Sequence, residues 1–466
     1  MEMRFRPVDR RQAFRLLAAG AVTVAWRSAK AATYALAPSR PYVRSDVARL
    51  RRVIMCPPGA GTFVPSSIDD DVLPMADWDD HALQSEYADL VVAVRSSGAQ
   101  VLLLPELLDS AIETARSRGT WETWLRATHP KLAGDPKIVT AQTLLGRDPA
   151  TQYRTWPDGT YKHIVDEADG LIFCRDMAVT VPSGVMLLNV GSARRMRGQL
   201  LLRFVFDNAP QLSRYPILLD AHQEGLLAEG GDFQVADEHT LFLGVGNRTD
   251  PRIAPILARR LQMDVITVQT RKVDSLRVTE RGFRLRAAFL HLDSYFTHVA
   301  DKQALTLPWF LEAAHVGKDP YTQFLQGMAA DSVISDDDLT AAKGFMRDFG
   351  SVRLFKAGSG DEDTSVKEMK LVDYVRSRGY RVHFVGGEPS ETDAIRHLFT
   401  RVLYEHERQG ANVVATSPGN VIAYEGATYT HAALRRAGIN VTTFSGRELW
   451  PWDGGPHCLT MPLERS

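Results

Sequence analysis

The C-terminal segment Asp453-Gly454-Gly455-Pro456-His457-Cys458 places a thiol in a loop that is rich in turn-forming residues. Its glycines allow the backbone to approach a ligand closely, and its proline fixes the turn. A charged His457 would favour the thiolate, which is the nucleophilic form of cysteine. The loop is therefore a candidate site of covalent catalysis. The alternative is that Cys458 is a small buried hydrophobic residue.

Acidic residues and a histidine accompany three further runs of apolar residues. Asp176 ends one run, the motif Glu229-Gly230-Gly231-Asp232 precedes a second, and His291-Leu292-Asp293 lies inside a third. If the third run is a strand, His291 and Asp293 share one face, which suits acid and base catalysis. The structural alternatives are an ion pair with a neighbouring arginine, an ordinary Gly-Gly turn and a satisfied core histidine.

Taken together, these residues favour a cationic substrate. Several carboxylates around a thiol raise its pKa, which makes the site a poor one for an anionic or neutral acyl group. Two carboxylates can instead hold a planar guanidinium by bidentate hydrogen bonds, and the bound cation would help the thiol to ionise. Arg195 and Arg248 follow strand-like runs, and their guanidinium groups match a carboxylate in shape. Surface charge is the alternative for both arginines.

The elements that must position these residues show an α/β pattern. Short strand-like runs alternate with helical spacing of apolar residues, and each strand-rich unit is accompanied by about one helix. We find no sequence repeat of fixed period, so the recurrence is structural only. Two segments, at about 106–168 and 304–365, are interpreted as insertions. The strand-like runs cover residues 52–56, 99–104, 170–188, 233–243, 283–296 and 413–424.

The composition is that of an ordinary globular protein, with 44% hydrophobic and 24% charged residues. A net charge of −1 indicates neither a nucleic-acid nor an anionic-membrane partner. Three cysteines cannot form a disulfide framework, and no cysteine or histidine spacing is typical of a structural zinc site.

The first 32 residues have the layout of an export signal. Arg10-Arg11 precedes an apolar stretch at 16–26, which is followed by small residues up to Ala32. The paired arginines predict a twin-arginine-like signal and thus an exported or periplasmic protein. The alternative is a disordered or helical N-terminus of a cytoplasmic protein. The apolar stretch is too short to span a bilayer. Residues 33–466 are then expected to form a single catalytic domain that contains the two insertions.

Four motifs occur in the order typical of guanidino-group-modifying enzymes. The chain resembles the pentein superfamily, and most closely arginine deiminase, over most of residues 51–465. The segment from Ala411 to Leu463 also follows the deiminase pattern. The motifs are Phe173-Cys174-Arg175-Asp176, Glu229-Gly230-Gly231-Asp232, His291-Leu292-Asp293-Ser294 and Gly454-Gly455-Pro456-His457-Cys458.

The resemblance implies an α/β fold: a five-bladed pentein propeller with pseudo-fivefold symmetry, plus helical insertions. It also implies that Cys458 attacks the guanidinium carbon and forms a covalent thiouronium intermediate. His291 would protonate the departing ammonia and then activate water, while Glu229 orients the guanidinium and assists proton transfer. No metal and no organic cofactor is implied. The implied substrate-binding residues are Asp176, Asp293, Asp232, Arg195 and Arg248.

The implied reaction is hydrolysis of L-arginine to L-citrulline and ammonia, a step of arginine catabolism. Two departures weaken the case for free L-arginine: Asp169-Gly170 replaces Pro-Asn, and Asp453 stands where the family usually has an arginine. The alternatives are an amidinotransferase, a deiminase of another guanidino compound and a non-catalytic pentein that binds partners. The expected partner is a small guanidino molecule, without nucleic acid or a membrane span, and a homo-oligomer remains an open alternative.

Overall fold

The computed structural model describes residues 42–59, 80–147, 152–154, 161–163, 169–192, 195–246, 248–270 and 289–466. The chain divides into two compact units, Met1–Ser39 and Arg40–Ser466, and all of the described residues belong to the second. The predicted export signal at 1–32 lies outside the described residues. Among those residues, no helix is both long enough and apolar enough to cross a membrane.

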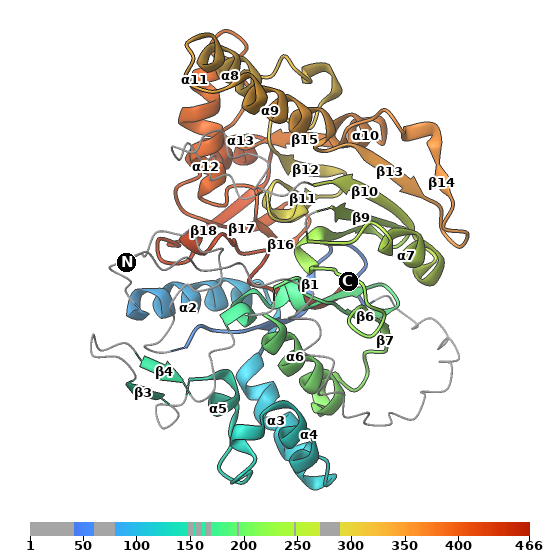
Figure 1. Cartoon of the computed structure of the whole chain (residues 1–466), viewed down its shortest axis with the longest axis vertical. Coiled ribbons are helices and arrows are strands. Elements are labelled where there is room, and N and C mark those ends of the chain that lie inside the picture. The colour runs from blue at the N-terminus through green and yellow to red at the C-terminus, as the bar shows by residue number, and fades with distance from the viewer. Residues whose placement is uncertain are drawn as a thin grey trace, which may run out of the picture. The chain divides into compact units, whose positions relative to one another are not determined.

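The described residues form a mixed α/β fold of several small sheets, five of which share one topology (Figure 1). In each of these five, the middle strand pairs antiparallel with the first strand and parallel with the third. In order, the strands are β19 (Met461–Arg465), β1 (Leu50–Met55) and β2 (Gln100–Leu103); β5 (Ala178–Val181), β6 (Gly184–Leu187) and β7 (Ile217–Asp220); β8 (Phe233–Asp237), β9 (Thr240–Val245) and β10 (Asp264–Gln269); β11 (Phe296–Ala300), β12 (Gln303–Thr306) and β15 (Arg381–Phe384); and β16 (Val414–Ser417), β17 (Asn420–Tyr424) and β18 (Asn440–Phe444).

A helix connects the second and third strands in four of these sheets. Helix α7 shows why such a helix packs against its sheet: Ile253, Leu257 and Leu261 recur at helical spacing and are all buried. The connection of the fourth sheet, from β12 to β15, is longer and carries several elements. The four single helices are α2 (Asp80–Ser96), α6 (Met196–Asn208), α7 (Ile253–Leu261) and α13 (Thr428–Arg436).

The long connection after β12 overlaps the segment interpreted as an insertion at 304–365. Its strands β13 (Val352–Phe355) and β14 (Glu362–Asp363) extend the third sheet from β10. The acidic run within it begins helix α9, where the Ser335 and Asp338 side chains form a capping box. Its helices, with those that follow β15, are α8 (Pro320–Ala330), α9 (Asp336–Asp348), α10 (Leu371–Ser377), α11 (Ala394–His397) and α12 (Leu403–Glu407).

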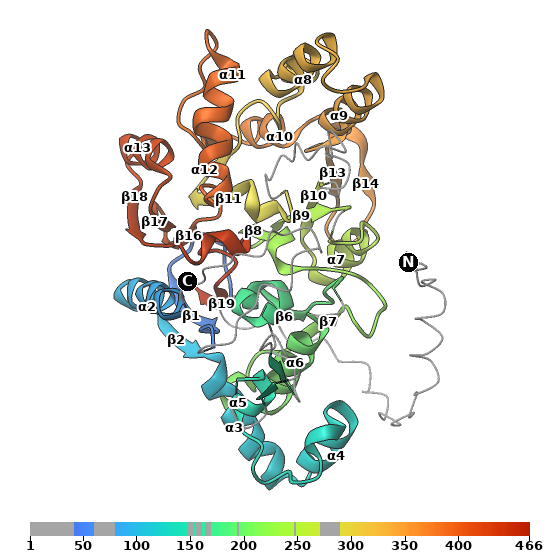
Figure 2. The same cartoon turned by 60° about the vertical axis from the view of Figure 1, so that its left-hand side comes forward.

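The segment interpreted as an insertion at 106–168 begins inside a helical region that follows β2. Helix α3 packs beside α6 in both views (Figure 1, Figure 2). Trp121 stacks on Trp124, and both rings contact Phe204 of α6, which joins this region to the second sheet. The elements are α3 (Leu104–Ser117), α4 (Trp121–Thr128), α5 (Ala141–Leu145) and the hairpin of β3 (Gln152–Arg154) and β4 (Tyr161–His163).

Short 3-10 turns replace two of the expected strand segments. The run at 170–173 belongs to the turn η3 (Asp169–Met177), and β5 begins only at Ala178. His291 directly precedes the turn η7 (Leu292–Ser294), Asp293 lies within it, and β11 begins only at Phe296. The strand interpretation was wrong at both places because a short buried apolar run looks the same in a turn as in a strand.

Strands of neighbouring sheets adjoin one another, and in all but one of these contacts, β16 with β1, both are the first strands of their sheets. Strand β8 contacts β11, β11 contacts β16, β16 contacts β1, and β19 contacts β5. The turns η3, η5 (Gly230–Asp232) and η7 also contact each other in sequence. The segments that lead into the first strands therefore come together, although they lie far apart in the chain.

Candidate functional site

Each of the five sheets contributes polar side chains from the segment just before its first strand. All of these side chains are buried. Because the first strands adjoin, their entry segments deliver these groups to one place. The contributing residues are Asp176 before β5, Glu229 and Asp232 before β8, His291 and Asp293 before β11, Asn412 before β16 and Cys458 before β19.

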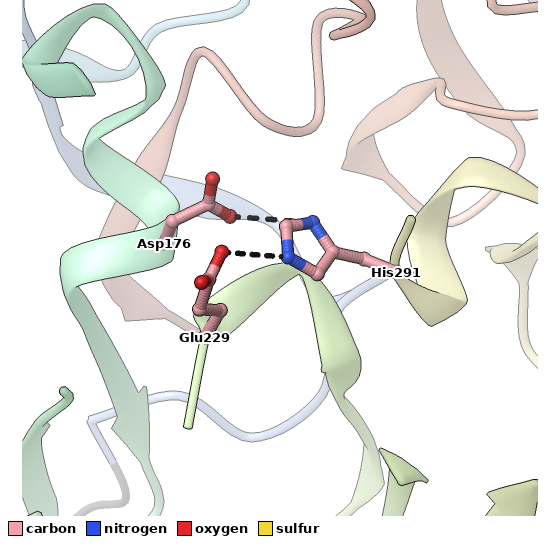
Figure 3. Close-up of side chains that lie close together, drawn as sticks. All are labelled: Asp176, Glu229 and His291. Carbon is pink, nitrogen blue, oxygen red and sulfur yellow. Dashed lines mark hydrogen bonds and ion pairs between the residues drawn. The ribbon is translucent and has the colours of Figure 1, made fainter. Parts of the chain in front are cut away.

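One half of the site is a cluster of two carboxylates and a histidine (Figure 3). His291 Nε2 lies 2.9 Å from Glu229 Oε2, and His291 Nδ1 lies 3.8 Å from Asp176 Oδ1. Burial alone would lower the pKa of His291, but the adjacent carboxylates outweigh it and raise the pKa to about 9. Burial likewise opposes ionisation of Glu229, yet His291 and Arg195 hold the pKa of that carboxyl well below its usual range. The cluster therefore holds an imidazolium beside ionised carboxylates.

The glycines of the Glu-Gly-Gly-Asp motif make this close packing feasible. A Cβ atom on Gly231 would lie 2.6 Å from His291 Nδ1, and one on Gly230 would lie 1.9 Å from the carbonyl oxygen of Arg175. Both distances are too short for real carbon contacts. The missing side chains of these glycines therefore leave the space in which His291 and the turn that carries Asp176 pack.

Arg195 provides the positive charge that balances the two carboxylates. Its Nη2 lies 2.7 Å from Asp176 Oδ2 and its Nη1 lies 3.0 Å from Glu229 Oε2, and the residue is buried. Arg248 lies farther out, with Nη1 3.5 Å from Glu229 Oε1 and 28% of its side chain exposed. Both arginines, predicted to bind a substrate carboxylate, thus contact the protein's own carboxylates.

The oxygen and nitrogen atoms that Asp176, Glu229 and His291 offer lie within 4.8 Å of one another, a spacing that could accommodate a metal ion. The guanidinium of Arg195 already pairs with both of these carboxylates. A divalent ion would have to displace that guanidinium and the proton of His291, since a ligating imidazole is neutral. The residues present therefore fit an organic cation better than a metal.

The other half of the site surrounds the thiol of Cys458. Its Sγ lies 3.3 Å from Asp293 Oδ2 and 3.0 Å from Asn412 Nδ2. Burial and the nearby carboxylates of Asp293 and Asp176 raise the pKa of this thiol well above its usual value, as the sequence predicted. The raised pKa favours the protonated thiol, and a cation bound beside it would favour the thiolate.

His457 contacts the carboxylate of Asp293. Its Nδ1 lies 2.8 Å from Asp293 Oδ2, while burial and the charge of Arg175 lower the pKa of the imidazole. A neutral His457 supplies no positive charge to the sulfur, so it does not give the help toward a thiolate that a charged imidazole would give. Burial would raise the pKa of Asp293, but the hydrogen bond with His457 lowers it.

Asp293 retains one oxygen without a partner. Its Oδ1 is buried and accepts no hydrogen bond from any residue that the structure describes. Leaving a buried acceptor unsatisfied costs about 1–3 kcal/mol, and more for a charged group. Because the other oxygen of the same carboxylate lies beside Cys458 Sγ, a donor that satisfied Oδ1 would be held next to the thiol.

Asp232 is buried close to this site, but its oxygens have partners. Oδ2 accepts from Thr249 Oγ1 at 2.7 Å, and Oδ1 accepts the backbone N–H of Leu292 at 3.0 Å. The second bond links the motif that contains Glu229 to the turn η7, which carries His291 and Asp293. These contacts favour a positioning role for Asp232.

Two residues of the site, Asn412 and Arg175, were not predicted from the sequence to act in it, and His457 was considered only for its possible charge. Asn412 and His457 bond directly to the thiol or to Asp293, and Arg175 holds the cysteine loop through its Nε, which donates to the carbonyl oxygens of His457 and Thr460. A signal existed for Asn412, since it is a polar residue directly before a buried strand, as the acidic residues of the motifs are.

Comparison with known proteins assigns the chain to a protein family. A model of the arginine deiminase family matches residues 78–465, and the chain belongs to that family. The family resemblance found in the four motifs is therefore confirmed. Arginine deiminase from Metamycoplasma hominis is 24% identical over 447 residues, which cover 91% of this chain and 96% of that protein. The arginine deiminase of Listeria welshimeri is 26% identical over 459 residues, with 91% and 98% covered.

Solved structures of related enzymes also align over most of the chain. The N-terminal domain of ArgZ, in covalent complex with a reaction intermediate, aligns with a TM-score of 0.45 at 12% identity and covers 89% of this chain and 98% of its own. A dimethylarginine dimethylaminohydrolase adduct aligns with a TM-score of 0.43 at 12% identity, with 89% and 99% covered.

Replacing Arg195 by alanine is expected to destabilise the fold strongly. The change leaves the buried carboxylates of Asp176 and Glu229 without their guanidinium, and breaking a buried ion pair in this way costs about 3–5 kcal/mol. Urea unfolding at neutral pH measures the loss. The matched control is Arg44→Ala, which breaks a pair whose arginine is 61% exposed and should cost at most about 1 kcal/mol. Equal losses in the two variants would contradict the balancing role of Arg195.

Stability is also expected to fall as pH rises above neutrality. His291 has a folded pKa of about 9, so its stabilising effect is complete below the unfolded pKa near 6.5 and is lost as pH rises through about 9. The protonation of His291 therefore contributes about 3 kcal/mol at most to the free energy of unfolding. Asp232, whose pKa burial raises to about 7, adds a loss of the same sign between about pH 4 and 7. Urea unfolding from pH 6 to 9 should show the decline, and His291→Gln should flatten it above pH 7. An unchanged slope in that variant would contradict the assignment.

Proposed function

We propose that this protein hydrolyses the guanidinium group of L-arginine to give L-citrulline and ammonia. The observation that carries the proposal is the geometry of Asp293: one oxygen lies 3.3 Å from Cys458 Sγ, and the other is buried and has no hydrogen-bond partner among the residues that the structure describes. A guanidinium N–H would satisfy that oxygen and place the guanidinium carbon beside the sulfur. Membership of the arginine deiminase family supports a hydrolase that acts on amidine carbon–nitrogen bonds.

In the proposed reaction, Cys458 supplies the nucleophile. The thiolate forms a bond from Sγ to the guanidinium carbon, and the bond from that carbon to a terminal nitrogen breaks as ammonia leaves. A water oxygen then adds to the carbon, and the carbon–sulfur bond breaks, which releases the ureido product and returns the thiolate. The positive charge of the substrate offsets the nearby carboxylates, which disfavour the thiolate.

His291 and Glu229 are assigned the proton transfers. The raised pKa of His291 means that the imidazole carries a proton at neutral pH and can donate it to the departing ammonia. The resulting neutral imidazole can then accept a proton from the attacking water. Glu229, whose Oε2 lies 2.9 Å from His291 Nε2, keeps the ring oriented and stabilises its protonated form.

Asp176 is assigned, with Asp293, to hold the guanidinium nitrogens of the substrate. Arg195 also pairs with one oxygen of Asp176, so substrate and Arg195 compete for this acceptor. We propose that Arg248, which is more exposed, receives the substrate carboxylate. Once the guanidinium of the substrate has displaced Arg195 from Asp176, Arg195 also binds the substrate carboxylate.

We further propose that the five sheets form the blades of a pentein propeller with pseudo-fivefold symmetry. The shared topology of the sheets supports this arrangement, as do the contacts between their first strands. The site would then lie where the entry segments of all five blades meet. Residues 33–466 would be one catalytic domain, and the helical segments at about 106–168 and 304–365 would be additions to it.

The decisive experiment is a substrate profile of the purified protein. We expect equal amounts of citrulline and ammonia from L-arginine, and weaker or no turnover of agmatine and methylarginines. No turnover of L-arginine at high enzyme concentration, with turnover of another guanidino compound, would reassign the substrate. Product that appears only when glycine or another amine is added would establish amidino transfer instead. No reaction with any of these compounds would favour a non-catalytic pentein.

Export through the N-terminal segment is a separate proposal, supported by the twin-arginine-like pattern at 1–32. Determining the N-terminus of protein recovered from cells tests it. A mature N-terminus close to Ala32 in the periplasmic fraction is the expected result. An intact Met1 in the cytoplasmic fraction would contradict it.

A further inference from the structure

The carboxamide of Asn412 uses its whole hydrogen-bonding capacity on two segments of the site. Its Oδ1 accepts the backbone N–H of His457 at 3.1 Å and that of Cys458 at 3.2 Å. Its Nδ2 donates to the carbonyl oxygen of Asp293 at 3.1 Å and to Cys458 Sγ at 3.0 Å. A carboxamide has two N–H donors and two acceptor lone pairs, so every one of them is engaged. The side chain is fully buried, with 0% exposed.

These partners determine which way the amide points. With oxygen and nitrogen exchanged, the NH2 group would face two backbone N–H donors, and the oxygen would face the Asp293 carbonyl and the sulfur. The contacts with these three backbone groups, two N–H donors and one carbonyl oxygen, would then be repulsive. The arrangement therefore places an N–H donor, and not an acceptor, on Cys458 Sγ.

This donor is significant because burial and the nearest carboxylates oppose a thiolate. Burial and the carboxylates of Asp293 and Asp176 raise the pKa of the Cys458 thiol, whereas the hydrogen bond from Asn412 lowers it. The same amide ties the cysteine loop to the Asp293 backbone, and these two segments must keep their spacing if a guanidinium is to bridge them. Asn412 also stands directly before β16, where it is the fifth sheet's contribution to the site.

We propose that Asn412 is a further catalytic residue, whose Nδ2 donates a hydrogen bond to Cys458 Sγ and stabilises the negative charge that the sulfur carries when it attacks. The same bond stabilises the sulfur as it leaves the carbon in the second half of the reaction. The proposal rests on the proposed function in one respect, since it takes Cys458 as the nucleophile.

The test measures the thiolate directly. Cys458 is alkylated with iodoacetamide between pH 6 and 10, and its modification is followed by peptide mass spectrometry in wild type, Asn412→Ala and Asn412→Asp. The rate follows the thiolate fraction. Losing a hydrogen bond to a charged group should slow alkylation at pH 8 by about tenfold or more and move the pH profile to higher pH. The control is Asn440→Asp, which adds the same charge at an exposed position of β18 and should match wild type.

Two results would overturn the proposal: a wild-type alkylation profile in Asn412→Ala, or faster alkylation. Faster alkylation would mean that the residue only packs the loop, since a loosened loop exposes the buried thiol. If neither variant folds, a crystal structure of the wild type decides: Nδ2 within hydrogen-bond reach of Sγ supports the proposal, and clear separation contradicts it. Alkylation needs no turnover, so an Asn412-dependent profile in a protein that fails to hydrolyse arginine would contradict only the proposed function.

Discussion

Cys458→Ala is expected to reduce L-arginine hydrolysis by about 10⁴-fold or more, because no covalent intermediate can form without the sulfur. The variant should fold, since the change removes one sulfur atom from a loop that Asn412 and Arg175 hold through backbone groups. Binding of arginine should persist because Asp176 and Asp293 remain. Citrulline release measures the first effect, and isothermal titration with arginine measures the second.

Cys174→Ala is the matched control for that variant. Cys174 is also buried, but its sulfur faces the carbonyl oxygens of Ile54 and Leu459, and burial raises the pKa of its thiol far above the usual range. Hydrolysis by the Cys174 variant should stay within a few-fold of wild type. Retained activity in Cys458→Ala, or equal losses in the two variants, would refute the assigned nucleophile.

His291→Gln is expected to reduce turnover by about 10²–10⁴-fold, the range typical of removing a general acid or base. Glutamine keeps a polar group near Glu229 but cannot give a proton to departing ammonia. The pH profile provides the sharper measurement. In wild type, activity should decline as pH rises through about 9, where the free enzyme loses the proton of His291, and the variant should lack this decline.

His383→Gln is the control for the histidine prediction. His383 is buried in β15, bonds to Gln303 and has a pKa lowered by burial. It belongs to no part of the proposed mechanism, so its substitution should leave both turnover and pH profile unchanged. If His291→Gln retained the decline near pH 9, the proton donor would have to be another group.

Local patterns of apolar residues are sufficient to predict some of the strands. Strands β8 and β16 follow from apolar spacing, and they begin within one residue of the expected runs at 233–243 and 413–424. Apolar spacing predicted strands at the turns η3 and η7 and was wrong there, because a buried apolar run looks the same in a 3-10 turn as in a strand. The polar residues were nonetheless predicted as one group, because unusual polar types at the ends of apolar runs need partners.

The sequence by itself determined the family, since membership depends on which residue types occur and in what order, and it predicts the nucleophile and the chemistry suited to a guanidinium. Only the tertiary structure decided how these groups pair. Arg195 bonds to Asp176 and Glu229, 19 and 34 positions away, and Asn412 bonds to Cys458, 46 positions away. Nothing local in the chain specifies such pairs. They arise because five sheets bring their entry segments together, and burial there leaves each charge and each donor only the partners that the other sheets supply.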